Sequence, residues 1–197
     1  RSGTPVREVG FDAGLAIDLT RLADAARGAG LVFFCNPNNP TATVHGRTAV
    51  ADLVKAVRQA SPDTVILIDE AYHDYVTLPT YETAVPLALS TPNVFVARTF
   101  SKAHGMAGLR AGYAIGDPAA IAKLQAYKMP NGLGTLTLTA ALTSLANTTH
   151  IAAERARNTE VRAFTVKALA DMGVGGTASQ ANFLFADLKR PAAAFRD

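Results

Sequence analysis

The sequence has few of the residues that cross-link a small secreted domain or build a metal centre. It contains a single cysteine, Cys35, so no disulfide can form within the chain. One cysteine cannot build a structural zinc site, and the four histidines show no ligand spacing such as His-x-x-x-His: His45, His73, His104 and His150. We therefore expect neither a disulfide scaffold nor a metal site.

Long apolar runs and clusters of like charge are also missing. No stretch approaches the roughly twenty apolar residues that a membrane helix needs. The 19 basic and 16 acidic residues are scattered over 197 positions, without a basic run that would follow a phosphodiester backbone. We expect neither a membrane nor a nucleic acid as partner. The lone cysteine fits a reducing compartment, so we expect a cytoplasmic protein, with a soluble periplasmic one as the alternative.

Apolar runs alternate with stretches of helical period along the first part of the chain. Helical spacing is predicted over residues 15–27, 47–60, 118–127, 138–145 and 151–172, the last of these ending at Gly173. Strands are predicted over residues 31–35, 64–68, 93–97 and 112–116, with a further strand at 181–186. Continuous apolar strands between helices are typical of strands buried on both faces of a mostly parallel sheet. The sequence therefore predicts an α/β fold with three layers, α/β/α.

Three polar clusters directly follow predicted strands. They are Asn36 to Thr41, Asp69 to Tyr72, and Thr99 to Lys102 with Gly108 to Tyr113 after it. Open parallel sheets bind ligands at the carboxyl ends of their strands, where several loops converge. We expect the three clusters to share one pocket.

The third cluster has the residue types that imine and phosphate chemistry need. A lysine that reacts as a free amine must lose its proton near neutral pH, which requires burial or a neighbouring positive charge such as that of Arg110. The hydroxyls of Thr99 and Ser101, with the Arg110 guanidinium, are donors suited to a phosphate monoester. Taken alone, the cluster favours the commoner interpretation of Lys102 as a solvated surface lysine.

The other two clusters have both a chemical and a structural interpretation. Asp69 at a strand end could pair with a protonated pyridine nitrogen, or could cap the following helix. Asn39, restrained by Pro40, could bind a phenolic oxygen with its amide, or could simply form a turn. Each cluster alone leaves the choice open.

Together, the clusters resemble the ordered signature of the fold-type I, class I/II aminotransferases, which depend on pyridoxal 5′-phosphate. The doubled asparagine of Asn36-Pro37-Asn38-Asn39-Pro40-Thr41 and the run Gly108-Leu109-Arg110-Ala111-Gly112-Tyr113 are most similar to the histidinol-phosphate aminotransferase family. The resemblance covers almost the whole chain. One departure is Ala42, where the family's loop usually has glycine, so we expect a slightly different backbone there.

This resemblance implies a role for each residue of the clusters. Lys102 would be the Schiff-base lysine and proton-transfer base, and Asp69 the partner of the pyridine nitrogen. Tyr72 and Asn39 would bind the phenolic oxygen, with Tyr72 also counted as catalytic. Thr99, Ser101 and Arg110 would bind the phosphate. The implied reaction moves an amino group from an amino acid, or an amino-alcohol phosphate such as histidinol phosphate, to a 2-oxo acid.

The resemblance also implies an organisation and leaves two other functions open. Residues 1–150 would be the cofactor-binding large domain, and residues 151–197 the linking helix and the start of a small α+β domain. The chain begins without an initiator Met or signal peptide, and we interpret it as a fragment of a longer subunit that forms a homodimer. The same fold hosts decarboxylases, lyases and oxidases, and non-catalytic sensing domains of regulators.

Overall fold

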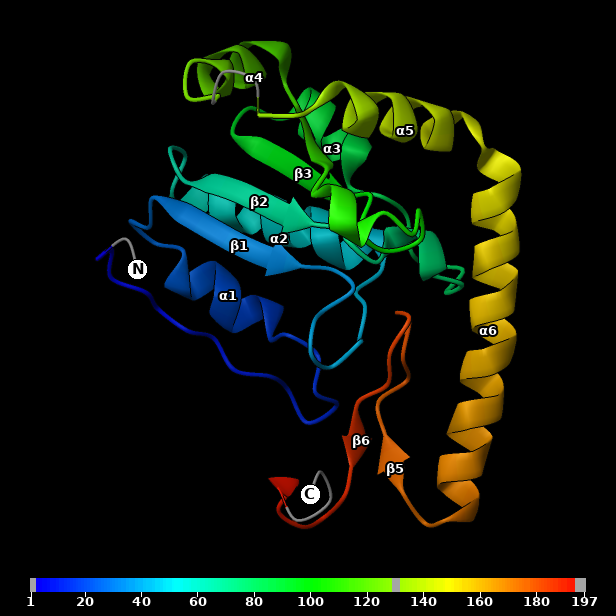
Figure 1. The fold of residues 1–197 in the computed structure, drawn as a ribbon. Helices are drawn as coiled ribbons and strands as arrows, with labels where there is room; N and C mark the ends of the chain where they lie inside the picture. The colour runs from blue at the N-terminus through cyan, green and yellow to red at the C-terminus, as the bar shows by residue number, and fades with distance from the viewer. Residues whose placement is uncertain (1–2, 129–131, 194–197) are drawn as a thin grey trace.

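A four-stranded sheet forms the centre of the molecule, and the computed structural model describes residues 3–128 and 132–193. Its strands follow the spatial order β1 (Leu31–Cys35), β2 (Val65–Asp69), β3 (Val94–Thr99) and β4 (Gly112–Gly116). The first three are parallel and β4 is antiparallel to β3. The carboxyl ends of β1 to β3 therefore lie at the same edge as the amino end of β4 (Figure 1). The predicted mostly parallel α/β sheet is confirmed.

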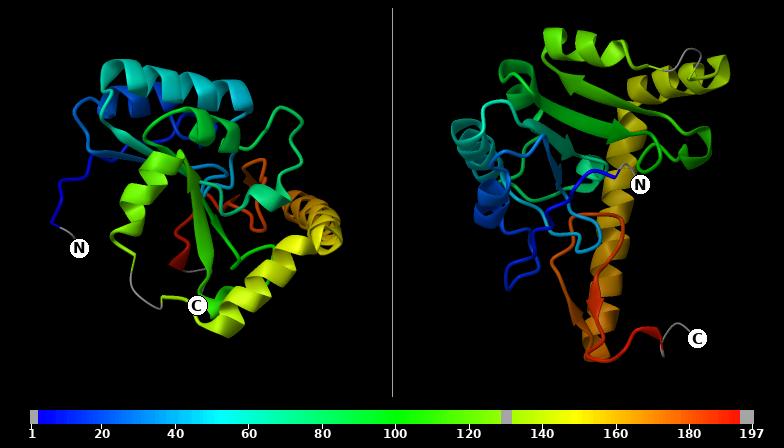
Figure 2. Two further views of the ribbon diagram at one scale, coloured as in Figure 1. Left: turned by 90° about the horizontal axis from the view of Figure 1, so that it is seen from above. Right: turned by 90° about the vertical axis from the view of Figure 1, so that its left-hand side faces the viewer.

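Three helices cover one face of this sheet (Figure 2). They are α1 (Leu19–Ala25), α2 (Arg47–Ala60) and α3 (Val85–Ser90). Because a helix repeats about every 3.6 residues, the α2 sequence places four apolar side chains on one stripe. Because a strand repeats about every 2 residues, alternate side chains of β1 and β2 point toward that stripe. The resulting core contains Val32, Phe34, Val50, Leu53, Val54, Val57, Ile66, Ile68, Val94 and Val96.

The other face of β1 is open to solvent in this chain. Leu31 and Phe33 are 55% and 58% exposed, whereas the alternate residues Val32 and Phe34 are buried. The expectation that the strands are buried on both faces is therefore wrong for β1. Helices α1, α2 and α3 pack on the face opposite Leu31 and Phe33, so these two side chains lie outside the core that those helices form.

The second half of the chain is mainly helical and ends in a small hairpin. It contains α4 (Pro118–Gln125), α5 (Thr135–Ala146), α6 (Thr148–Asp171) and the paired strands β5 (Gly175–Gly176) and β6 (Ala186–Asp187). The long helix α6 stands beside the sheet and β5 and β6 run back along it (Figure 1). Residues 194–197, at the end of the predicted second unit, lie outside the described residues.

Two predicted elements differ most from the structure. The helix expected over residues 15–27 begins only at Leu19, because Leu15 has a positive φ of 62° and the Asp18 side chain caps the helix by accepting from Arg21 N. The strand expected over residues 181–186 is wrong apart from its last residue. There Ser179 Oγ bonds the carbonyl of Phe183 and the amide of Ala181, which folds the backbone into turns.

Two short 3₁₀ helices follow the strand ends that concern the site. They are η1 (His73–Tyr75), after β2, and η2 (Ala107–Leu109), between β3 and β4. Among the described residues, none of the helices combines the length and the apolarity that crossing a bilayer requires.

Candidate active site

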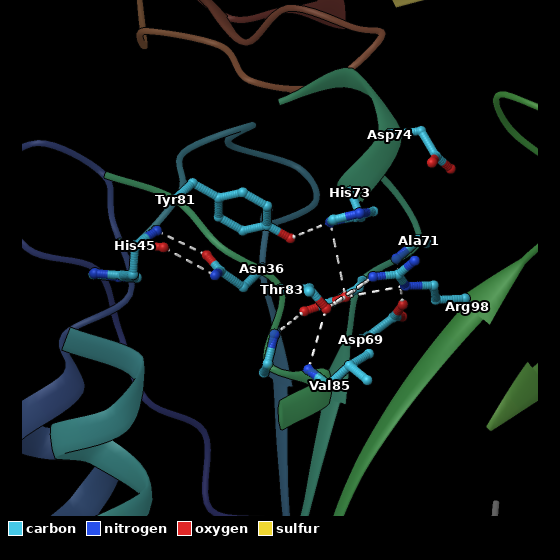
Figure 3. Close-up of polar contacts among 12 residues, drawn as sticks. Asn36, His45, Asp69, Ala71, His73, Asp74, Tyr81, Thr83, Val85 and Arg98 are labelled. Atoms are coloured by element: carbon cyan, nitrogen blue, oxygen red, sulfur yellow. Dashed lines mark hydrogen bonds and ion pairs between the residues drawn. The ribbon is translucent and has the colours of Figure 1, made fainter. Parts of the chain in front are cut away.

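The loop after β1 is closed by one asparagine and presents another. Asn36 is buried, and its side chain both donates to the carbonyl of His45 (3.1 Å) and accepts from its amide (2.7 Å), which joins the two ends of the loop (Figure 3). Asn38, also buried, donates to the Thr41 hydroxyl at 2.8 Å. These two side chains form their hydrogen bonds within the loop. The third, Asn39, donates instead to the Tyr72 hydroxyl at 3.0 Å.

Asp69 is the last residue of β2 and lines a pocket at the carboxyl edge. Its Oδ1 accepts from the Ala71 amide at 3.0 Å, which closes a local turn. The helix that follows, η1, has Tyr72 at its N-cap and no side-chain cap, so the alternative role of Asp69 as a helix cap is wrong. Burial raises the pKa of Asp69 above its usual value, while the Ala71 hydrogen bond and the charge of Lys102 act in the opposite direction. A half-buried carboxylate of this kind gains from a nearby cation.

The neighbouring Glu70 does not line this pocket and belongs to a buried polar network. Only 2% of Glu70 is exposed, and its carboxylate accepts from the Ala84 amide (2.6 Å), from the Thr83 hydroxyl (2.8 Å), and from Arg98 Nε (3.1 Å) and Nη2 (2.8 Å). The Glu70 carboxylate raises the pKa of Arg98 against the opposing effect of burial. The network ties the end of β2 to β3 and to the start of α3.

Sequence reasoning assigned no role to Glu70 or Arg98. A signal was present, because an arginine inside the apolar strand β3 and a glutamate directly after the apolar strand β2 each require an opposite charge when buried. The pairing itself was not visible, since the two residues are 28 positions apart.

Lys102 and Tyr72 approach each other from different loops. Lys102 Nζ lies 5.1 Å from the centre of the Tyr72 ring. Tyr72 is buried, and its ring is held in an apolar cluster with Ala42, Tyr75, Ala103 and Ala181. The Tyr72 hydroxyl accepts the hydrogen bond from Asn39, and the Tyr72 ring lies near Lys102. Both groups therefore belong to one side chain, whose position is fixed by packing.

The third cluster closes the pocket from the side of β3 and β4. Thr99 Oγ1 accepts from the Ser101 amide at 3.0 Å, which turns the chain sharply after β3. Arg110 has a positive φ of 52° and donates from Nη1 to the Ala107 carbonyl at 2.9 Å. Because β4 is antiparallel to β3, the segment that carries Arg110 returns to the edge where Thr99 ends its strand.

All seven residues predicted for the site line one pocket of about 440 Å³: Asn39, Asp69, Tyr72, Thr99, Ser101, Lys102 and Arg110. The pocket also contains four residues that were not predicted for it, Cys35, Ala71, Ala97 and Arg98. Burial raises the pKa of the Cys35 thiol to about 11, and its Sγ donates to the Pro37 carbonyl at 3.1 Å. A thiol held neutral in this way is typical of a packing residue and not of a nucleophile.

The functional groups of the pocket suit a phosphorylated pyridine cofactor. A carboxylate in a desolvated position suits a protonated ring nitrogen, and the amide and hydroxyl of the Asn39–Tyr72 pair suit a phenolic oxygen. Two hydroxyls and a guanidinium suit a phosphate. A lysine amine lies in the same pocket, and the volume is within the usual range for small-molecule sites, about 300–1,000 Å³.

Comparison with known proteins agrees with this geometry. The chain is 41% identical over 182 residues to the histidinol-phosphate aminotransferase of Symbiobacterium thermophilum, covering 92% of this chain and 49% of the relative. It is 42% identical over 191 residues to the aromatic amino acid aminotransferase of Mycolicibacterium paratuberculosis, covering 93% of this chain and 50% of that protein. The chain thus spans about half the length of these relatives.

Solved structures and the family profile give the same result. The histidinol-phosphate aminotransferase of Sinorhizobium meliloti, solved in complex with pyridoxal 5′-phosphate, superposes with a TM-score of 0.90 at 26% identity, over 98% of this chain and 52% of that one. The profile of the family described as aminotransferase class I and II matches residues 1–197. The chain therefore belongs to the class I and II aminotransferases, a family of enzymes that depend on pyridoxal 5′-phosphate.

Proposed function

We propose that the complete protein transfers an amino group from an amino acid, or an amino-alcohol phosphate such as histidinol phosphate, to a 2-oxo acid, with Lys102 carrying the cofactor. The observation that carries the proposal is the meeting of the Lys102 amine, the Asp69 carboxylate and the Asn39–Tyr72 pair in one pocket. These groups come from three separate strand ends, and an unrelated structural role would not require them to converge.

Each residue has a task that follows from its position. Bound pyridoxal 5′-phosphate supplies an electron sink for the carbanion formed at the substrate Cα. Asp69 keeps the ring nitrogen protonated, which its desolvated carboxylate favours because a cation relieves the cost of burial. Lys102, once its amine is free, would move the proton between the substrate Cα and the cofactor carbon.

The remaining residues fix the orientation of the cofactor. The Asn39 amide and the Tyr72 hydroxyl, 3.0 Å apart, would donate to the phenolic oxygen. Thr99, Ser101 and Arg110, which line the same pocket, would hold the phosphate, and the Arg110 guanidinium would supply the charge. Contacts at the ring nitrogen, the phenolic oxygen and the phosphate would hold the cofactor in one orientation, which favours reaction by proximity and orientation.

The test of the cofactor assignment is chemical. We expect the complete protein with added pyridoxal 5′-phosphate to develop an absorbance band that borohydride converts into a stable adduct on the peptide containing Lys102. Lys102→Ala should lose both the band and the adduct, and Lys55→Ala, a control at an exposed lysine on α2, should keep both. An adduct that forms equally in the Lys102→Ala protein would contradict the assignment.

The choice of amino donor needs a separate assay. Relatives described as histidinol-phosphate and as aromatic amino acid aminotransferases are equally similar in sequence, at 41% and 42% identity. We infer histidinol phosphate first, because the doubled asparagine and the Gly108 to Tyr113 run resemble that group. Comparing kcat/KM for histidinol phosphate, phenylalanine and tyrosine with 2-oxoglutarate tests this. Release of carbon dioxide without amino transfer would favour a decarboxylase instead.

We also infer that the protein works as a homodimer. Its helix α5 exposes a set of leucines that a partner subunit would cover, Leu136, Leu138, Leu142 and Leu145. The molar mass of the complete protein, measured by light scattering on a sizing column, tests this. A monomer at micromolar concentration would contradict it.

A further inference from the structure

A segment far along the chain packs against the two loops that carry Asn39 and Tyr72. This segment, residues 177–183, lies between β5 and β6 and reaches from the hairpin toward the carboxyl edge of the sheet (Figure 1). It begins with Thr177, whose hydroxyl donates to the Thr41 carbonyl in the loop after β1. Its far end is Phe183, whose ring meets the Tyr72 ring edge-on, with centroids 5.1 Å apart at 75°.

Gln180, in the middle of the segment, joins the two loops directly. Its backbone amide donates to the Ala42 carbonyl at 2.9 Å, three residues beyond Asn39. Its side-chain Oε1 accepts from the amides of Thr77 (2.8 Å) and Leu78 (3.1 Å), which follow η1. One residue therefore connects the loop of Asn39 with the loop that follows Tyr72.

The segment is itself fixed from the opposite side. The Ala181 carbonyl accepts from Asn158 Nδ2 (3.3 Å) and from Arg162 Nη1 (3.2 Å), both on α6. Ala181 is fully buried against the Tyr72 cluster. The segment is therefore held by α6 on one side, through Ala181, and by the two pocket loops on the other, through Gln180.

We propose that Gln180 is a positioning residue, which holds Asn39 and Tyr72 at the spacing that lets both donate to the phenolic oxygen of the cofactor. The proposal rests on the function proposed above. Sites of this kind tolerate displacements of only about 0.5 Å before their hydrogen bonds weaken. Gln180 does not line the pocket, so its effect must pass through the loops.

The effect is measurable in the cofactor's own titration. Hydrogen-bond donors stabilise the anionic form of the phenolic oxygen, which shares a proton with the lysine-linked nitrogen. They therefore lower the pKa at which this proton leaves. If Gln180 no longer holds the loops, these donors weaken and the midpoint of the absorbance titration rises. We expect a rise of about 0.5–1 pH unit and a several-fold weaker cofactor affinity.

The experiment compares four variants of the complete, cofactor-loaded protein. Gln180→Leu keeps the size of the side chain but removes the acceptor, and Gln180→Ala serves if that variant does not fold. Gln180→Glu keeps an acceptor for the Thr77 and Leu78 amides and should restore the wild-type midpoint. Gln59→Ala removes an exposed glutamine on α2 and should change nothing.

The outcomes separate the two proposals. A raised midpoint and weakened cofactor affinity in Gln180→Leu, restored in Gln180→Glu, support the positioning role. If Gln180→Leu has the titration midpoint and the cofactor affinity of the wild type, the positioning role is overturned, even if its unfolding midpoint is lower. The role is also overturned if Gln180→Glu shifts the titration midpoint as much as Gln180→Leu does. Absence of any Lys102 adduct in the wild-type protein would instead overturn the proposed function.

Discussion

The Asn39 side-chain amide donates a hydrogen bond to the Tyr72 hydroxyl at 3.0 Å, across 33 positions of the chain. Asn39 belongs to the loop after β1 and Tyr72 to the loop after β2, and these strands are neighbours in the sheet. The hydrogen bond therefore connects two loops that the parallel topology places side by side. It also fixes two donors before any ligand arrives, which lowers the cost of ordering them on binding.

This pair should be energetically coupled in the cofactor-free protein. Tyr72→Phe keeps the ring near Lys102 and removes the hydroxyl, and Asn39→Ala removes the amide. A double-mutant cycle of unfolding free energies should give a coupling of about 0.5–1.5 kcal/mol, the usual net value of one hydrogen bond. Additive losses, within about 0.3 kcal/mol, would show that the hydrogen bond is absent in solution.

Replacing Asp69 should weaken cofactor binding more than it affects folding. Asp69→Asn keeps the shape and removes the charge that the ring nitrogen would meet, and a hydrogen bond to a charged group contributes about 1.5–3 kcal/mol. We expect a cofactor dissociation constant about 10–100 times larger, measured by fluorescence titration. Asp52→Asn, at an exposed position of α2, is the matched control and should bind as the wild type does. Equal affinities for the two variants would remove Asp69 from the site.

Glu70 should matter for stability in a way that an exposed glutamate does not. Glu70→Gln leaves the buried Arg98 guanidinium without its charge partner, which typically costs about 3–5 kcal/mol. Glu82→Gln removes a glutamate whose side chain is 55% exposed and paired with Arg47, and should cost less than about 1 kcal/mol. Urea unfolding of both variants tests the difference. If Glu70→Gln and Glu82→Gln lost similar amounts of unfolding free energy, the Glu70–Arg98 pair would be well solvated.

Cys35 should react slowly in the folded protein. Burial and the nearby Asp69 carboxylate raise its pKa from 9.0 to about 11, which leaves about 100-fold less thiolate at pH 8. We expect labelling by a disulfide reagent at pH 8 to be at least about 30 times slower in the native than in the urea-unfolded protein. A native rate close to the unfolded one would contradict the raised pKa.

The same shift predicts a pH dependence of stability. The folded state disfavours the thiolate, so the contribution of Cys35 to stability is complete below pH 9 and is lost as the pH rises to about 11. Unfolding free energies of the wild type and of Cys35→Ala, measured from pH 8 to 11, should therefore converge with increasing pH. Parallel curves would show that the thiol does not titrate in this window.

Ala42 should tolerate replacement by glycine unusually well for a buried position. Its φ of 56° is in the left-handed region, which costs a residue with a Cβ about 1–2 kcal/mol. Glycine removes that cost but loses about 0.8 kcal/mol of methyl burial and adds chain entropy to the unfolded state. Ala42→Gly should therefore change unfolding free energy by less than about 1 kcal/mol.

Ala181→Gly is the matched control for Ala42→Gly. Ala181 is equally buried, at 0% exposure, but it lies outside the left-handed region, so glycine relieves no strain there. It should lose about 1–2 kcal/mol in the same thermal or urea unfolding measurement. Equal losses at the two positions would show that Ala42 is not strained.

The sheet and the pocket could be predicted from sequence because their signals are local. The strands read as apolar runs, and polar residues directly after them mark the edge where Asp69 and Lys102 meet. Helix ends were less predictable, since Leu15 in a left-handed conformation shortens α1 in a way that apolar spacing does not reveal.

Contacts between distant parts of the chain were not predictable in the same way. The apolar run around Phe183 resembles a strand, yet Ser179 folds it into turns and places Phe183 against Tyr72, 111 positions earlier. Likewise, the exposure of Leu31 and Phe33 depends on which face the helices cover, and alternation within β1 cannot specify that.

The antiparallel direction of β4 determines where this chain can tolerate insertions and deletions. Thr99 pairs with Gly112, and the Phe100 amide donates to the Ala111 carbonyl, so the loop between them is closed at its base. Lys102 and Arg110 both lie within that closed loop, and a change in its length would move one relative to the other. We expect natural length variation to be scarce there and to accumulate instead in the α2–β2 turn, at the opposite edge of the sheet.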